Sequence, residues 1–540
     1  MRTIRLGGRW LVPLLSIASL SAASSDMRLV EAVKKADKAA VRALLQQRID
    51  VNTPEADGTT ALHWAAQQDD RQTADLLIRA GANVKAANRY GVTPLYAACV
   101  NGNAAIIEAL LKAGADPNTI LPEGETALMT AARTGKVDAV KVLLAHGADV
   151  NAKERWRGQT SLMWAAAEGH VAVAQALIEL GADINARSNG GFTPVLFAAR
   201  AGQIDAAKAV IAAGANVNDT IQGARPAAGG SGGGRGGTYN PSSANAANNP
   251  AAARAALAQA LNTGNRGNPG PNGTSALVLA VINAHFELAA ALLDLGADPN
   301  ADGQGWTALH QLAWTRRPPI QHGLPNAVPT GKIDSLTLAK ALLAHGANPN
   351  ARQKTEPADG ARNVLDRIGS TPFLLAAKVG DTDYMRVLVA GGADPSLTTE
   401  EGTTPMMAAA GVGIWHVGES AGTSEEAFEA VKLAYELGND VNAVNGNGDT
   451  ALHGAAIRGA NAIVQFLVDK GVKMDARNKI GWTPLTIAEG VMYPNTFNRQ
   501  LETAALLHQL GAKDPGQRRP EDLPPADVFD AAQRKTQTKP

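Results

Sequence analysis

Cysteine is almost missing from this chain of 540 residues, because Cys99 is the only one. A single cysteine cannot form a disulfide within the chain, and motifs of paired cysteines are excluded too. Cys99 follows Ala97 and Ala98 in an apolar stretch. We therefore expect a small buried side chain there and not a reactive thiol.

Charge of one sign and aromatic side chains are scarce as well. The 50 basic residues balance the 50 acidic residues, and aromatic residues make up only 4% of the chain. Binding of nucleic acid depends on a clustered basic surface, for which a neutral chain gives no case. We therefore expect no nucleic-acid partner.

Motifs for catalysis and cofactor binding are missing. The chain has no Gly-x-Ser-x-Gly, no phosphate-binding loop and no His-Glu-x-x-His. Eight of the ten histidines occupy places that recur along the chain, and the other two, His322 and His416, have no companion at metal-ligand spacing. We therefore expect no catalytic residue, no metal and no cofactor, and we predict that the protein is not an enzyme.

The apolar run near the N-terminus is short. Arg2, Arg5 and Arg9 precede the apolar residues 10–20, and small residues follow at 21–23. This order is typical of an export signal that is cleaved after residue 23. Eleven apolar residues are too few to span a bilayer. We expect a signal peptide at residues 1–23, a periplasmic or extracellular location, and no stable membrane insertion.

A short phrase that begins with threonine recurs along the chain. The first copies start at Thr60, Thr93, Thr126, Thr160 and Thr193, at intervals of 33 or 34 residues. A fixed period of this length predicts stacked structural units, each too small to bury its own apolar face. Three later intervals of 82, 64 and 46 residues exceed one 33-residue unit by 49, 31 and 13. These surpluses indicate insertions into a regular array, whose later copies start at Ser275, Thr307, Thr371, Thr404, Thr450 and Thr483.

One copy, residues 88–118, shows what a unit does. Thr93 can cap a helix, and Pro94 suits its first position. Gly102 ends that helix, and apolar residues at helical spacing predict a second one that ends at Gly114. Each unit is therefore expected to be helix, turn, helix and reversing loop.

The opening Thr-x-Leu-His and a closing Gly-Ala-Asp-x-Asn, as at residues 147–151, resemble the ankyrin repeat. The resemblance covers residues 26–218 and 273–512, of which 26–52 form an atypical first unit with a polar face. It implies an all-α solenoid of helix pairs with projecting hairpin loops. It also implies a monomeric protein that binds another protein.

Two segments depart from the repeats. Residues 219–272 have the Gly- and Asn-rich composition of a flexible insertion, and residues 513–540 that of a disordered tail. Regular repeat sequences on both sides of the insertion favour a single continuous stack of repeats from which the insertion projects as a loop. Two separate stacks are the alternative.

Aromatic residues suggest where a partner binds. Trp64, Trp164 and Phe197 follow the His position of their repeats, on the face that the first helices form. They form a candidate apolar strip, with packing against the adjacent repeat as the alternative. Trp156, between two arginines at a loop tip, is a better candidate, because a tip offers little to bury it.

Three insertions, 315–332, 411–424 and 490–499, lengthen the turn between the two helices of their repeats. We predict a shared partner surface there, with neutral loop variation as the alternative. The side chains that we expect to contribute are Trp314, Arg316, Arg317, Trp415, His416, Tyr493 and Phe497.

Together these features predict an exported bacterial protein that acts as a non-catalytic scaffold or adaptor in the cell envelope. Two alternatives stay open. One is an enzyme whose site is built from the three insertions. The other is a module that binds a glycan or peptide by stacking it on Trp314 and Trp415.

Overall fold

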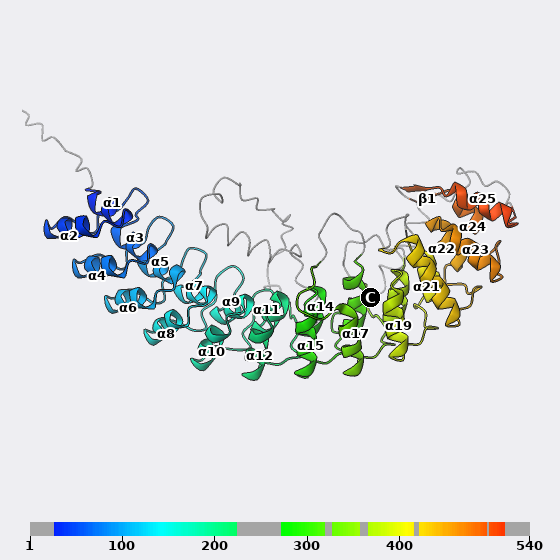
Figure 1. The fold of residues 1–540 in the computed structure, drawn as a ribbon, viewed down its shortest axis with the longest axis horizontal. Coiled ribbons are helices and arrows are strands. Elements are labelled where there is room, and N and C mark those ends of the chain that lie inside the picture. The colour runs from blue at the N-terminus through cyan, green and yellow to red at the C-terminus, as the bar shows by residue number, and fades with distance from the viewer. Residues whose placement is uncertain are drawn as a thin grey trace, which may run out of the picture. The chain divides into compact units, whose positions relative to one another are not determined.

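The computed structural model describes residues 26–223, 272–318, 327–356, 365–414, 421–493 and 496–513. These residues form 24 helices and one short β-hairpin, which confirms the predicted all-α repeat fold (Figure 1). The chain divides into two compact units, residues 1–149 and 150–540, and each is described by itself. The predicted signal peptide, most of the Gly- and Asn-rich insertion and nearly all of the predicted tail lie outside the described residues.

The first unit contains four helix pairs. Its atypical first pair caps the array, and three regular repeats follow. The helices are α1 (Arg28–Lys34), α2 (Lys38–Gln46), α3 (Ala61–Gln67), α4 (Arg71–Arg79), α5 (Pro94–Asn101), α6 (Ala104–Lys112), α7 (Ala127–Thr134) and α8 (Val137–Ala145).

The second unit contains eight helix pairs and the hairpin. The helices are α9 (Ser161–Glu168), α10 (Val171–Glu179), α11 (Pro194–Ala201), α12 (Ile204–Ala212), α14 (Ala276–Ile282), α15 (Phe286–Asp294), α16 (Ala308–Arg316), α17 (Ser335–Ala344), α18 (Pro372–Lys378), α19 (Thr382–Ala390), α20 (Pro405–Ala410), α21 (Ser424–Glu436), α22 (Ala451–Arg458), α23 (Asn461–Asp469), α24 (Pro484–Glu489) and α25 (Leu501–Gln509). Strands β1 (Val491–Tyr493) and β2 (Thr496–Asn498) lie between the last two helices.

The residue that opens each repeated phrase is the N-cap of a first helix in all eleven copies. Thr93 Oγ1, for example, accepts a hydrogen bond from the backbone N–H of Tyr96 at 3.2 Å. Gly102 then ends helix α5 with a φ of 70°, in the left-handed region that favours glycine. Cys99 is buried in this helix as expected, and burial raises the pKa of its thiol well above the usual value.

The closing phrase joins successive reversing loops. Asn151 Nδ2 donates to the carbonyl of Gly181 at 3.1 Å, and Asn151 Oδ1 accepts from the N–H of Asp183 at 2.8 Å. Asn118, Asn218, Asn300 and Asn350 make the same pair of bonds with the next loop of their own unit. The repeated asparagine therefore satisfies backbone groups that would otherwise face only solvent.

The repeats on the two sides of the long insertion are neighbours in the second unit. The backbone N–H of Ile221 donates to the carbonyl of Thr274 at 2.9 Å, and that of Gly273 donates to Ile221 at 2.8 Å. Helix α14 packs on helix α11 in the same way that the first helices of other adjacent repeats pack on each other. The loop-out interpretation expects this arrangement.

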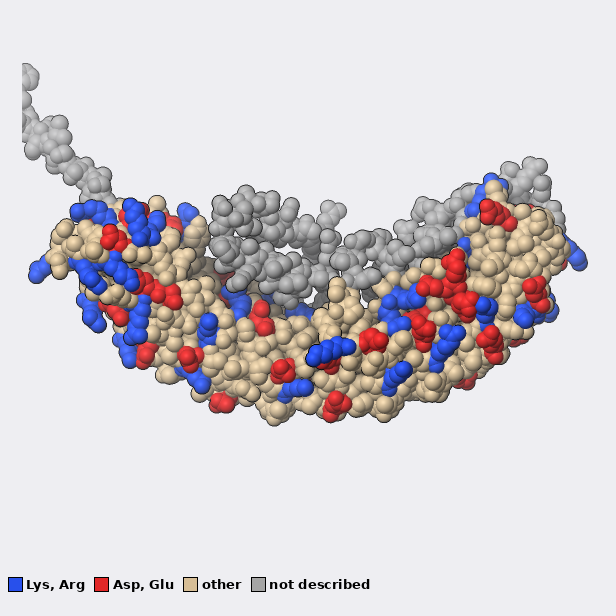
Figure 2. Space-filling model, in the orientation of Figure 1, with Lys and Arg blue, Asp and Glu red and all other residues tan. Residues whose placement is uncertain are grey.

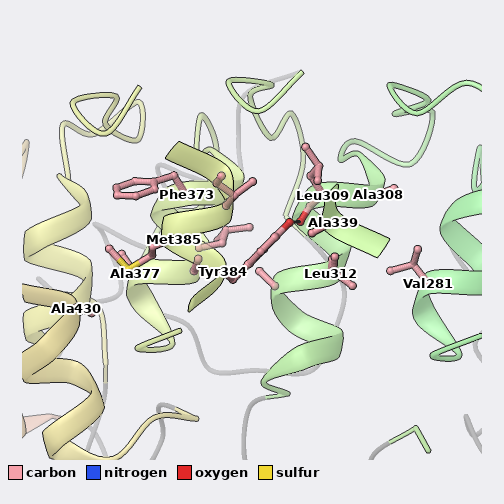
Figure 3. Close-up of a cluster of buried hydrophobic side chains, with 14 of the residues drawn as sticks. Val281, Ala308, Leu309, Leu312, Ala339, Phe373, Ala377, Tyr384, Met385 and Ala430 are labelled. Atoms are coloured by element: carbon pink, nitrogen blue, oxygen red, sulfur yellow. Dashed lines mark hydrogen bonds between the residues drawn. The ribbon is translucent and has the colours of Figure 1, made fainter. Parts of the chain in front are cut away.

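The core of the second unit is built from facing first and second helices. Tyr384 of α19 reaches toward α16 and donates its hydroxyl hydrogen to the carbonyl of Leu309 at 2.7 Å (Figure 3). Phe373 and Met385 lie beside it in this buried layer. Burial raises the pKa of the Tyr384 phenol well above its usual value, so the hydroxyl stays a donor.

Two features of the second unit differ from the sequence prediction. Insertion 315–332 holds only part of the 31 surplus residues, because the hairpin loop between α17 and α18 is lengthened as well, with Gln353 hydrogen-bonded to Gly369 and Ser370. Insertion 490–499 contains strands β1 and β2, paired antiparallel. Three-residue strands are too short for an alternating pattern to reveal them.

Candidate partner-binding surface

The loop tip around Trp156 in the second unit is the most exposed aromatic feature predicted from the sequence. The Trp156 side chain is 75% exposed. Beneath it, the buried carboxylate of Glu154 accepts hydrogen bonds from the backbone N–H groups of Trp156 and Arg157, each at 2.7 Å, and from that of Gln159 at 3.2 Å. The indole is therefore held out in solvent on an ordered loop.

The next hairpin loop braces this tip. The N–H of Asn189 donates to the carbonyl of Arg157 at 2.7 Å, and Asn189 Nδ2 donates to that of Trp156 at 3.1 Å. The ammonium group of Lys153 also donates to the carbonyl of Arg187 at 2.9 Å. A tip that is fixed from below and from the side loses little conformational freedom when a partner binds.

Phe197 does not face solvent, so the alternative of packing within the stack applies to it. It is only 3% exposed, and its ring lies 5.5 Å from that of Phe192. The guanidinium group of Arg200 lies 5.0 Å from the centres of both rings. These neighbours cover the face that was predicted to bind a partner, while Trp164 of the same unit is half-buried.

Trp64 lies in the first unit and is half-buried there. Its indole N–H donates to Glu55 Oε2 at 2.6 Å, and Glu55 Oε1 is 2.9 Å from the ammonium group of Lys34. Lys34 in turn lies 5.0 Å from the centre of the Trp64 ring. These mutual contacts hold the indole within its own unit. The predicted strip of Trp64, Trp164 and Phe197 is therefore not a row of freely exposed aromatic side chains.

Arg316 and Arg317, which were predicted to contact a partner, are paired inside the second unit. Arg316 binds the carboxylate of Asp381 through Nε at 2.7 Å and Nη2 at 3.0 Å. Arg317 Nη1 lies 2.7 Å from Glu426 Oε2. Arg316 therefore joins its repeat to the next one, and Arg317 reaches the repeat after that, so both guanidinium groups are engaged within the unit.

Trp314 is half-buried within the same unit. Its ring meets that of Trp306 edge to face at 5.5 Å, and Arg367 lies 5.6 Å from its centre. A glycan or peptide would have to share a ring that already has two partners. The structure therefore gives Trp314 a packing role.

The remaining predicted residues are not placed by the structure. Trp415 and His416 lie outside the described residues, as does His322. Tyr493 and Phe497 are described only through their backbone, in which Tyr493 pairs with Thr496 and Phe497 with Met492. The shared surface of the three insertions stays a prediction.

Three of the recurring histidines, His63, His310 and His453, link repeats. In α16, His310 Nδ1 accepts from the backbone N–H of Thr307 at 3.3 Å, so Nε2 carries the hydrogen and donates to the carbonyl of Ser370 at 3.1 Å. His63 and His453 make the same contacts with their own neighbours. Burial lowers the pKa of His310 to about 4 and keeps its imidazole neutral.

Sequence reasoning missed two polar features. One is the brace that Glu154 and Asn189 give to the Trp156 tip. The brace follows a recurring pattern, because a backbone hydrogen bond also joins successive hairpin tips elsewhere, for example from the N–H of Arg89 to the carbonyl of Asp57. The other is the buried guanidinium group of Arg458, whose Nε and Nη2 have no hydrogen-bond partner in the described part of the chain.

Two searches of the described residues bear on other kinds of site. No group of three or more His, Cys, Asp and Glu side chains in this part of the chain is placed to hold a metal ion. Among the same residues, every helix is too short or too polar to cross a membrane.

Helix pairs recur every 33 or so residues, apart from the insertions, with capped first helices and hydrogen-bonded reversing loops, and they define a helical repeat protein. The family models agree. The model for ankyrin repeats in three copies matches residues 29–121, 116–188, 157–221 and 421–513, and the single ankyrin-repeat model matches 272–303 and 368–400. These matches cover more than half of the chain, which therefore belongs to the ankyrin-repeat family.

Curated relatives are similar over parts of their length. Human ankyrin repeat and SOCS box protein 16 is 35% identical over 38% of this chain and 40% of the relative. Mouse B-cell lymphoma 3 protein homolog is 30% identical over 39% of each chain. Mouse 2-5A-dependent ribonuclease is 35% identical over 19% of this chain and 10% of the relative. The chain thus spans 40% or less of these relatives.

Proposed function

We propose that this protein is a non-catalytic scaffold or adaptor that binds another protein through the loop tip 155–157. One observation carries the proposal: Trp156 is 75% exposed although three backbone hydrogen bonds to Glu154 hold its loop in place. Large aromatic side chains dominate binding energy when a partner buries them. A fixed loop adds affinity because little ordering remains to be done.

The family supports protein binding over the two alternatives. Ankyrin repeats form the matched part of this chain, and the ribonuclease match covers only 10% of that protein, so its activity does not transfer. The internal contacts of Trp314, Arg316 and Arg317 remove side chains that an enzyme or glycan-binding site in the insertions would have used. We propose that the protein is monomeric by itself and binds no nucleic acid or cofactor.

The N-terminal sequence supports a further proposal, that the protein is exported by a bacterium and acts in the cell envelope. The argument is the arginine-flanked apolar run and the small residues at 21–23. The relatives quoted above are mammalian and add nothing to it. N-terminal sequencing of the mature protein tests the proposal: a chain that starts at Ser24 supports cleavage, and one that retains residues 1–23 contradicts it.

Affinity capture tests the binding proposal. The tagged chain is expressed in its host, and co-purifying proteins are compared for the native chain, Trp156→Ala and Tyr90→Ala. Tyr90 is a matched control, because it is an exposed aromatic residue at a hairpin tip of the first unit, beside Arg89. A stoichiometric protein that is lost only from Trp156→Ala supports the proposal. Turnover of a small substrate without a protein partner contradicts it.

A further inference from the structure

We infer that the Trp156 tip binds an acidic segment of its partner, in which Asp and Glu flank an apolar side chain. The inference rests on the proposed function and adds the chemistry of the ligand. It is argued from the positive charges near Trp156 in the sequence and from the carboxylates of the same region, which already have partners within the protein.

Three exposed cations lie within three residues of Trp156 in the sequence. Lys153, Arg155 and Arg157 are exposed, and none of them forms an ion pair with another described residue. The Lys153 ammonium group meets only a backbone carbonyl, that of Arg187. The one carboxylate within the tip, Glu154, is buried and turned inward to three backbone N–H groups.

The neighbouring carboxylate is also neutralised. Asp219 pairs with the guanidinium group of Arg187 and accepts the hydroxyl hydrogen of Thr193 at 2.8 Å. Burial lowers the pKa of Arg200, and the positive charge of Arg157 lowers it further, so the charge of Arg157 acts on its surroundings. The field around Trp156 is therefore positive, which favours carboxylates on an approaching partner.

The basic patch is local and does not form a stripe. The next tip carries Asn189 and Gly190, the long insertion interrupts the one after it, and the tip beyond that carries Asp302 in an ion pair with Lys354. On the visible face, charges of both signs are interspersed (Figure 2). A nucleic-acid backbone is bound best by a row of cations along its length. A short acidic peptide segment needs only a local patch, and the exposed indole offers its apolar residue a surface.

Peptide binding to the full chain tests the inference. The probe is a fluorescein-labelled peptide Asp-Glu-Leu-Phe-Glu-Asp-Glu, and the controls are its Asn/Gln counterpart and a twelve-nucleotide oligo(dT). We expect the acidic peptide to bind at least tenfold more tightly than either control. Its affinity should fall as salt rises from about 50 mM to about 500 mM, because exposed charges are screened.

Charge reversal locates the site. The double variant Arg155→Glu, Arg157→Glu should weaken binding of the acidic peptide at least tenfold. The matched control, Arg42→Glu with Lys141→Glu, reverses two exposed cations that lie outside the tip and should leave binding within about twofold. Equal binding of the neutral peptide, tighter binding of the oligonucleotide, or no effect of the tip reversal would overturn the inference.

A cross-link separates this inference from the function on which it rests. A photo-reactive phenylalanine placed at position 156 captures the segment of a host protein that touches the tip. A captured segment rich in Asp and Glu supports both statements. A neutral or basic segment overturns the acidic chemistry and leaves protein binding intact. Absence of any cross-linked protein contradicts the proposed function itself.

Discussion

Arg316 and Asp381, 65 residues apart in the sequence, form a two-pronged ion pair with N···O distances of 2.7 and 3.0 Å. Arg316 ends the first helix of one repeat, and Asp381 caps the second helix of the next by accepting the N–H of Tyr384 at 3.2 Å. The Asp381 side chain is only 1% exposed. One carboxylate thus joins the cap of α19 to the preceding repeat.

Removal of this carboxylate should destabilise the second unit. We expect Asp381→Ala to lower the free energy of unfolding by about 3–5 kcal/mol, because it leaves the guanidinium group of Arg316 uncompensated and uncaps α19. Urea denaturation measures the loss, and hydrogen exchange of α16 and α19 locates it. Asp383→Ala, at an exposed site on the same helix, is the control and should change stability by less than about 0.5 kcal/mol. Equal effects of the two substitutions would contradict the role given to Asp381.

The second unit should lose stability in mild acid through His310. Its folded pKa of about 4 lies below the unfolded value of 6.5, so stability is fully present above pH 6.5 and is lost as the pH falls toward 4. The shift corresponds to about 3 kcal/mol at most. Burial also lowers the pKa of His453 in the same unit and of His63 in the first unit, so each should lower the stability of its own unit in acid.

Denaturation of the native chain at pH 7, 6, 5 and 4 measures this loss. His310→Gln supplies the comparison, since its side chain does not titrate. The variant should be less stable at pH 7 but should lose less on acidification. Parallel pH profiles for the two proteins would show that His310 is not the titrating group.

The buried guanidinium group of Arg458 should reduce stability. It is 7% exposed, two of its nitrogens have no hydrogen-bond partner among the residues that the structure describes, and burial lowers its pKa to about 10. Replacement of an uncompensated buried charge by an apolar side chain of similar length is often stabilising. We expect Arg458→Met to raise the free energy of unfolding by about 1–3 kcal/mol.

Thermal denaturation of the Arg458→Met variant shows directly whether the substitution raises or lowers stability. Arg133→Met at the end of α7 is the comparison. Arg133 lies 3.5 Å from the Glu125 carboxylate, so its replacement should lower the thermal stability of the protein. A loss of stability in Arg458→Met comparable to that in Arg133→Met would show that the Arg458 guanidinium group is compensated.

The Glu154 carboxylate beneath the Trp156 tip should affect the affinity for the partner but not the folding of the repeats. We expect Glu154→Ala to release the N–H groups of Trp156, Arg157 and Gln159, so that their hydrogen exchange becomes faster and partner binding weakens about tenfold. Thermal denaturation checks that the stack is retained. Unchanged exchange at these three amides would show that Glu154 does not hold the tip.

The repeat architecture was predictable because each unit repeats its own local signals. Thr93 as a cap and Gly102 as a stop depend on residues within one period. The exposure of Trp156 followed from its place at a loop tip. Sequence position alone sufficed for these features.

Contacts specific to one pair of repeats could not be predicted in this way. The partner of Arg316 is set by an insertion of irregular length, so no fixed spacing points to Asp381. The burial of Phe197 depends on Phe192, and no other copy has a phenylalanine before its opening Thr or Ser. Strands β1 and β2 have no counterpart in the repeat and were missed.

The most direct measurement of the central claim is the dissociation constant of the purified partner for the native chain, Trp156→Ala and Tyr90→Ala. The proposed surface predicts at least a thirtyfold loss, about 2 kcal/mol, for Trp156→Ala and less than a threefold change for Tyr90→Ala. Native affinity in Trp156→Ala, or an equal loss in both variants, would contradict the claim that this tip is where the protein binds.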